Sequence, residues 1–161
     1  MPIIEIATEI KAPIEVCFDL ARSVDFHVYS MKDTGEQAIA GVTSGLIGMN
    51  QKVTWRAKHF GIWQNLTSEI TSFDRPYHFR DAMKRGAFKR LEHDHFFEFN
   101  SGYTVMRDRF DFQAPFGLLG KCADILFLQR YMLRLISNHN LVLKVTAETN
   151  PERFLSLEVD K

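Results

Sequence analysis

The alternation of hydrophobic and polar residues predicts a strand followed by two short helices at the start of the chain. Residues 3–10 are rich in β-branched side chains and read as a strand, and Pro13 then stands where the first turn of a helix tolerates proline. Residues 14–22 form an amphipathic run typical of a short helix. Ser23 is the expected N-cap of a second short helix over residues 23–31.

From residue 36 the pattern changes to strand-like segments that are separated by turn signals. Turns are expected at Phe60-Gly61, near Arg85-Gly86 and at Ser101-Gly102. The segments expected as strands are 36–41, 51–59, 62–73, 77–83, 90–99 and 103–112. With the first strand they predict an antiparallel meander of about seven strands.

A long amphipathic helix is expected after this meander. Pro115 and Gly117 end the last strand, and apolar residues then recur at helical spacing over about five turns. The predicted face consists of Leu118, Cys122, Ile125, Leu126, Met132, Leu133 and Ile136, with Gln129 as its one polar position. The pattern weakens after Asn138. We expect a single domain over residues 1–149 and a C-terminal tail over residues 150–161.

A second apolar arc widens the face of this helix. It is formed by Phe127, Leu128, Tyr131 and Leu135. A helix with such an arc can bury two faces, so a contact in a homodimer is a possible further role.

The turn at Ser101-Gly102 sets a register for the hairpin that contains it. A two-residue turn brings residues on the two strands into opposite pairs. The pairs on one face are Phe99 with Thr104, Phe97 with Met106, His95 with Asp108, and His93 with Phe110. This face is apolar with a His and an Asp in its middle. The same register places Asp94 opposite Arg109 on the other face, and such a pair of opposite charges supports an outward assignment.

Two further strands contribute inward residues by the same argument. A turn at Phe60-Gly61 puts Trp55 and His59 on one inner face. In residues 77–83, Phe79 and Asp81 share a face. We therefore expect Asp81 to point inward, in addition to His95 and Asp108.

The composition narrows the classes of partner. Twenty basic and twenty acidic residues give a formal net charge of zero. The chain therefore has no excess of positive charge that would attract nucleic acid or an anionic membrane. The apolar stretch 118–136 is interrupted by charges, so no membrane insertion is expected. The N-terminus lacks a signal-peptide pattern and the two cysteines are far apart, which favours a cytoplasmic protein.

This succession of elements resembles the helix-grip fold of the START and birch-pollen-allergen superfamily, also called SRPBCC. The segments AGVTSGLIG, VTWRAKHFGIWQNLTSEI, FDRPYHFRDAMKRGAFKRLEHDHFFE and RDRFDFQAPFGLLGKCADILFLQRYMLRLI are similar to its bacterial cyclase/dehydrase-like, ligand-binding branch. The resemblance implies an α+β domain in which a curved sheet grips the C-terminal helix. Members bind lipids, hormones, quinones or polyketides in the cavity between them, some catalyse cyclisation, and others act through protein partners. No catalytic residue is implied.

We therefore expect binding of a small hydrophobic or amphipathic ligand. Apolar walls would give affinity, and a few polar groups would anchor the ligand. The residues expected at the ligand are Trp55, His59, Phe79, Asp81, His93, His95, Phe97, Met106, Asp108, Phe110, Leu126, Gln129 and Leu133.

Three alternatives remain open at this point. His95 held by Asp108 could act as an acid or base in a polyketide cyclase or dehydratase. The same pair could be purely structural. The C-terminal helix could instead dock a protein partner.

A metal site is a weaker reading of the same residues. His93 and His95 lie two residues apart on one strand face, a spacing at which two imidazoles can share a metal, with Asp108, Asp81 or His59 as further ligands. Two histidines in a strand are a weak signal, so we expect no metal and no cofactor.

Overall fold

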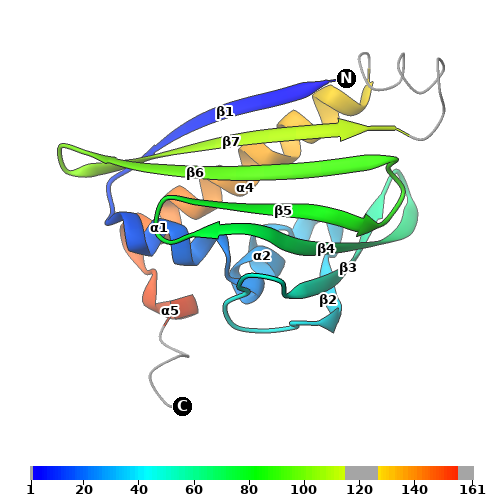
Figure 1. Ribbon diagram of the computed structural model, residues 1–161, viewed down its shortest axis with the longest axis horizontal. Helices are drawn as coiled ribbons and strands as arrows, with labels where there is room; N and C mark the ends of the chain where they lie inside the picture. The colour runs from blue at the N-terminus through cyan, green and yellow to red at the C-terminus, as the bar shows by residue number, and fades with distance from the viewer. Residues whose placement is uncertain (1, 115–126, 156–161) are drawn as a thin grey trace.

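One antiparallel sheet of seven strands curves around the C-terminal helix in the computed structural model, which describes residues 2–114 and 127–155 (Figure 1). Its strand order is β1-β7-β6-β5-β4-β3-β2, so β2 to β7 form an antiparallel meander as predicted, and β1 pairs with β7. The strands are β1 (Ile3–Ile10), β2 (Gln37–Gly41), β3 (Lys52–His59), β4 (Ile62–Asp74), β5 (His78–Arg85), β6 (Arg90–Asn100) and β7 (Tyr103–Gln113). The predicted α+β helix-grip architecture is confirmed.

Short helices close one end of the sheet, and a long helix crosses its inner face (Figure 1). They are α1 (Ile14–Ala21), α2 (Val24–Ser30), the 3-10 turn η1 (Lys32–Thr34), α4 (Gln129–Thr149) and α5 (Glu152–Leu155). Ser23 caps α2 as predicted, because its Oγ accepts a hydrogen bond of 3.2 Å from the backbone N–H of Phe26.

The tight hairpin turns fix the register of the sheet. Ser101 and Gly102 both adopt positive φ, 48° and 95°, which a two-residue turn between twisted strands requires. His95 therefore pairs with Asp108, and Asp94 pairs with Arg109, as predicted. The hairpin that turns at Phe60 and Gly61 also has its predicted register, with His59 opposite Ile62.

Helix α4 extends further than the hydrophobic pattern indicates. It continues to Thr149, so the weakening after Asn138 does not mark its end. The buried stripe in its second half includes His139, Asn140 and Thr146, and a hydrophobicity pattern does not count such polar residues as core. The start predicted at Leu118, together with Cys122, Ile125 and Leu126, lies outside the described residues.

The main core lies under α1. Phe18 is fully buried and meets Phe73, Phe79 and Phe97 edge to face, at centroid distances of 5.4, 5.3 and 5.4 Å. Phe154 of α5 is also buried and packs 5.4 Å from Phe26. Residues 152–155 thus pack on the core, while the division of the chain at residue 149 stays a prediction.

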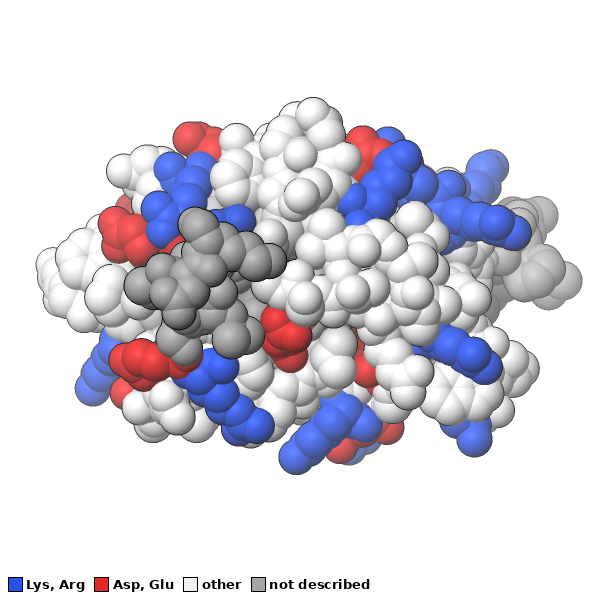
Figure 2. Space-filling model, turned by 90° about the horizontal axis from the view of Figure 1, so that it is seen from below, with Lys and Arg blue, Asp and Glu red and all other residues white. Residues whose placement is uncertain are grey.

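Charges of both signs are dispersed over the molecular face seen in Figure 2, where acidic and basic side chains alternate around uncharged regions. This distribution agrees with the formal net charge of zero. None of the helices in the described ranges is long and apolar enough to cross a membrane.

Candidate functional site

A cavity of about 810 Å³ lies between the inner face of the sheet and α4. Most of its wall is apolar, because the inward residues of β3, β4 and β6 face the apolar side of the helix. The apolar lining includes Val53, Trp55, Ala57, Leu66, Ile70, Phe79, Leu91, Phe110, Leu128, Met132, Leu135 and Ile136.

Seven of the thirteen residues expected at a ligand line this cavity. They are Trp55, His59, Phe79, Asp81, His93, His95 and Phe110. Leu126 lies outside the described residues. The other five are placed elsewhere, for two different physical reasons.

Phe97, Met106 and Asp108 point inward as predicted but do not line the cavity. Phe97 and Met106 belong to the main core with Phe18, because α1 covers this end of the sheet and fills the space above them. Asp108 is buried behind the two histidines and reaches the cavity only through them.

Gln129 and Leu133 do not line the cavity, because the side of α4 that faces the cavity differs from the predicted side. The cavity side of α4 carries Leu128, Tyr131, Met132, Leu135, Ile136 and His139. Each residue turns the helix by about 100°, so Leu133 lies well away from this side and is 43% exposed. The arc considered for a homodimer, Phe127, Leu128, Tyr131 and Leu135, lines the cavity, and the homodimer stays a prediction.

Asp108 on β7 joins the two histidines of β6 from behind. Its Oδ1 lies 2.9 Å from His93 Nε2 and 3.0 Å from His95 Nδ1. The contact with His93 is a hydrogen bond. The contact with His95 Nδ1 is close but lacks the alignment that a hydrogen bond requires. Asn140 of α4 donates from Nδ2 to the other carboxylate oxygen at 2.6 Å. The carboxylate is therefore held from the sheet and from the helix, as a buried charge requires.

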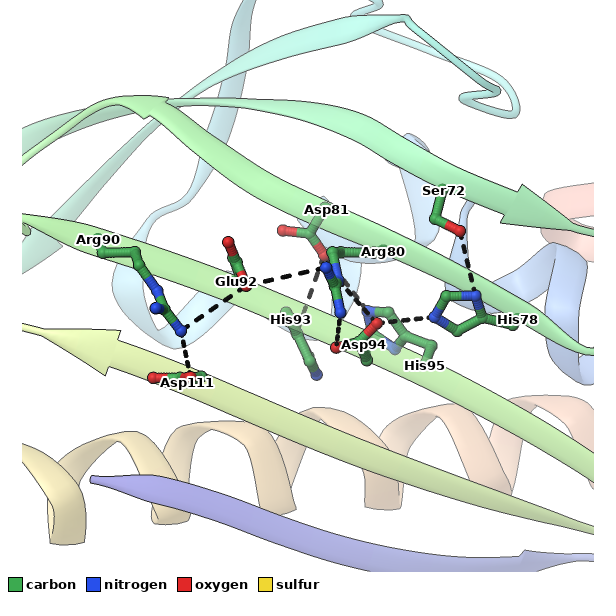
Figure 3. Close-up of polar contacts among 10 residues, drawn as sticks. All are labelled: Ser72, His78, Arg80, Asp81, Arg90, Glu92, His93, Asp94, His95 and Asp111. Atoms are coloured by element: carbon green, nitrogen blue, oxygen red, sulfur yellow. Dashed lines mark hydrogen bonds and ion pairs between the residues drawn. The ribbon is translucent and has the colours of Figure 1, made fainter. Parts of the chain in front are cut away.

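Asp81 on β5 meets the same histidines from the cavity side. Its Oδ2 lies 3.4 Å from His95 Nε2 and 3.9 Å from His93 Nδ1, and the side chain is 25% exposed. The two imidazole rings are 3.9 Å apart. Figure 3 shows Asp81, His93 and His95 gathered on one face of β5 and β6. Each histidine thus lies between two carboxylates.

This arrangement makes His95 a cation at neutral pH. Burial by itself lowers the pKa of His95, but the neighbouring carboxylates of Asp108 and Asp81 outweigh this effect and raise the pKa to about 9. Burial likewise acts to raise the pKa of Asp108, and His93 and His95 hold it well below the usual range. The predicted His95 and Asp108 pair is therefore an ionised pair.

The opposite face of the same strands carries a separate polar network (Figure 3). Arg80 donates to Asp94 through Nε and Nη2, both at 2.9 Å, and Asp94 also contacts His78 Nε2 at 2.7 Å. Asp94 is outward as expected. Its partners come from β5, while Arg109 lies 3.8 Å from Glu5 of β1.

Further polar groups on the cavity wall were missed in the sequence. Tyr131 O–H bonds His59 Nδ1 at 2.7 Å, and burial lowers the pKa of His59, which keeps it neutral. His139 contacts Ser30 Oγ at 2.6 Å through Nδ1. His139 and Asn140 follow Ile136 by three and four residues, so a helical spacing continued through polar residues would have found them.

Comparison with solved structures decides the fold. Protein TTHA0849 from Thermus thermophilus matches with a TM-score of 0.74 at 18% identity, and a START superfamily protein from Mycobacterium smegmatis with 0.69 at 9%. Both alignments cover 91% of this chain and 97% of the other. The chain has the START helix-grip fold. A further helix-grip protein, the Zhui aromatase/cyclase from a Streptomyces species, matches with 0.68 at 14% identity over 91% of this chain and 93% of that one.

The sequence comparisons add no closer assignment. No protein-family model matches this helix-grip chain, and no curated protein matches it. The resemblance predicted from the sequence is thus confirmed for the fold, and the narrower cyclase/dehydrase-like branch stays a prediction.

Proposed function

We propose that this protein binds a small hydrophobic or amphipathic molecule in the cavity between the sheet and α4. The observation that carries the proposal is the cavity itself, about 810 Å³ with mostly apolar walls and a few polar groups, among them the cluster of Asp81, His93 and His95. Ligand sites in proteins typically have about 300–1,000 Å³ and a few placed polar groups. The fold shared with START proteins supports the same function.

The polar end of the ligand would lie at Asp81. Its carboxylate is the most accessible member of the cluster that it forms with His93 and His95. A carboxylate is an acceptor only, so the matching ligand group is a donor such as a hydroxyl or an amine. The apolar body would lie along Trp55, Leu66 and Phe110.

Native mass spectrometry of gently purified protein, followed by organic extraction, tests this proposal. We expect a retained apolar compound in the wild type and weaker retention in Ala57→Phe, because Ala57 is buried on the cavity wall and a benzyl group there projects into the space a ligand would use. Lys58→Phe is the matched control, since Lys58 is exposed and its side chain points to the other face of the same strand.

Two outcomes would count against ligand binding. One is a wild type that retains no compound and takes up no apolar fluorescent probe. The other is equal retention by Ala57→Phe and Lys58→Phe, which would place the compound outside the cavity.

A cyclase or dehydratase activity is the second candidate. The observation that favours it is the position of His95 on the cavity wall between Asp108 and Asp81. These carboxylates raise its pKa to about 9, and a cationic imidazole can donate a proton to a leaving hydroxyl or a carbonyl oxygen. Asp108 would keep that imidazole oriented. A poly-β-keto thioester is the substrate class to assay, and turnover that is unchanged in both His95→Ala and Asp108→Asn would exclude this role.

A further inference from the structure

We propose that Asp81, His93 and His95 form a binding site for a divalent transition-metal ion on the cavity wall. One ligand atom from each residue lies within 4.8 Å of the other two. The sequence alone led us to expect no metal, because only the two histidines are neighbours along the chain. Of the further ligands considered, the fold selects Asp81 on the adjacent strand β5, where it pairs in register with His93.

The distances between the ligand atoms suit such an ion. Tetrahedral zinc with bonds of about 2.1 Å separates its ligand atoms by about 3.4 Å. Asp81 Oδ2 lies 3.4 Å from His95 Nε2 and 3.9 Å from His93 Nδ1. The remaining pair of ligand atoms also lies within 4.8 Å, so the three atoms need to draw together by about 1.4 Å at most to form a coordination shell.

The outer contacts of the two imidazoles point to the same conclusion. A metal-bound histidine almost always uses its second ring nitrogen to bond a carboxylate or carbonyl group. His93 makes this bond through Nε2 to Oδ1 of the buried Asp108 at 2.9 Å. The second nitrogen of His95, Nδ1, lies 3.0 Å from the same oxygen as an ion-pair contact that is not aligned as a hydrogen bond. Asn140 holds the other oxygen of Asp108. Asp108 is thus a positioning residue that directs His93 Nδ1 and His95 Nε2 toward the ion, which would displace the proton that His95 Nε2 carries at neutral pH.

The donor set defines the class of metal. Two imidazole nitrogens and one carboxylate oxygen favour zinc, iron, cobalt or nickel. Magnesium and calcium are disfavoured because they prefer oxygen ligands. Three protein ligands leave at least one coordination position open. Because all three residues line the cavity, that position faces its interior, where water or a ligand oxygen can occupy it. The site does not depend on the proposed organic ligand.

Calorimetric titration of chelator-treated protein with Zn²⁺ tests the site. We expect one equivalent bound with micromolar or tighter affinity, and a loss of at least about 10-fold in affinity for Asp81→Asn and for His93→Gln. His78→Gln is the matched control, since His78 also contacts an aspartate but lies on the opposite face of β5. Its affinity should equal that of the wild type.

Nitrogen-15 NMR of the histidine rings distinguishes coordination from a structural role. With Zn²⁺ bound, the metal should lie on His93 Nδ1 and His95 Nε2, and the ring protons should remain on the nitrogens that face Asp108. Asp108→Asn should weaken Zn²⁺ binding by about 10- to 100-fold, and Asp108→Glu should restore part of it. If Asp108→Asn fails to fold, Asp81→Asn at the partly exposed ligand still decides the question.

The proposal is overturned if the wild type binds no stoichiometric Zn²⁺. It is also overturned if Asp81→Asn and His93→Gln bind as the wild type does, or if the NMR signals place the metal on other histidines. Zinc binding by a protein that retains no apolar compound would leave this site in place and remove the ligand-binding proposal. A protein that retains an apolar compound but binds no Zn²⁺ would leave the ligand-binding proposal in place and remove this site.

Discussion

Asn140 donates a hydrogen bond of 2.6 Å from Nδ2 to Oδ2 of Asp108, and this contact joins α4 to β7 behind the cavity. Both side chains are buried. A hydrogen bond to a charged group contributes about 1.5–3 kcal/mol, and a buried carboxylate that loses its donor cannot recover it from water. The helix and the polar cluster are therefore coupled through one amide.

Replacing that amide should destabilise the fold. We expect Asn140→Ala to lower the free energy of unfolding by about 2 kcal/mol in urea denaturation. Asn138→Ala is the matched control, because Asn138 is exposed on the same helix and its removal should change stability by less than about 0.5 kcal/mol. Equal effects of the two substitutions would contradict a special role for the bond to Asp108.

Phe18 is the side chain whose loss should cost the core most. It is fully buried and meets three other aromatic rings. Phe18→Ala should lower the free energy of unfolding by about 3–5 kcal/mol, through lost burial and the cavity that is left. In Phe99→Ala the ring removed is 54% exposed, and the same denaturation experiment should show a loss below about 1 kcal/mol. A small loss for Phe18→Ala would mean that the core around α1 is loosely packed.

The strand register was predictable because local turn chemistry determines it. Two-residue turns with positive φ leave one pairing for each hairpin, and the pairing decides which side chains face inward. The opposition of His95 and Asp108 therefore follows from the sequence around Ser101-Gly102. The same reasoning explains why Trp55 and His59 line the cavity.

The contacts across elements were less predictable. Asp108 is shared by both histidines and held by Asn140, an arrangement that depends on side-chain directions and on the curvature of the sheet around α4. The error at Leu133 has a simpler origin, since the apolar pattern of α4 is broad and its phase is set by His139, Asn140 and Leu143 further along. Which inward residues become core depends on how far α1 covers the sheet.

Two glycines with the same backbone conformation should respond differently to alanine. Gly41 and Gly45 both have φ of +76°, a left-handed conformation that costs a residue with a Cβ about 1–2 kcal/mol. A Cβ on Gly41 would lie 2.2 Å from the backbone oxygen of Lys52, whereas one on Gly45 meets nothing within 4 Å. Gly41→Ala should therefore destabilise the protein more than Gly45→Ala.

Thermal unfolding and amide exchange check this comparison. Gly41→Ala should also raise amide exchange in β2, because relief of the clash moves β2 away from β3, with which Gly41 pairs. Gly45→Ala should lower stability and leave exchange in β2 as in the wild type. If both variants lose the same stability, the approach of Gly41 to Lys52 is not the limiting contact.

His139 should make the protein less stable in mild acid. Burial lowers the pKa of its imidazole well below the usual value, with a further contribution from the nearby His27, while Asp108 acts in the opposite direction and His95 and His93 in the same one. The folded state therefore keeps His139 neutral at a pH at which the unfolded chain, with a histidine pKa of about 6.5, takes up a proton. The stabilising effect is present above pH 6.5 and is lost as the pH falls.

The expected slope is up to about 1.4 kcal/mol per pH unit below pH 6.5 for this one proton. Urea denaturation at a series of pH values should show the slope reduced in His139→Gln. Ser30→Ala is the control, because it removes the hydroxyl that contacts His139 Nδ1 at 2.6 Å but keeps the buried imidazole. That variant should be less stable at every pH and retain the slope. An unchanged slope in His139→Gln would assign the acid sensitivity to other groups.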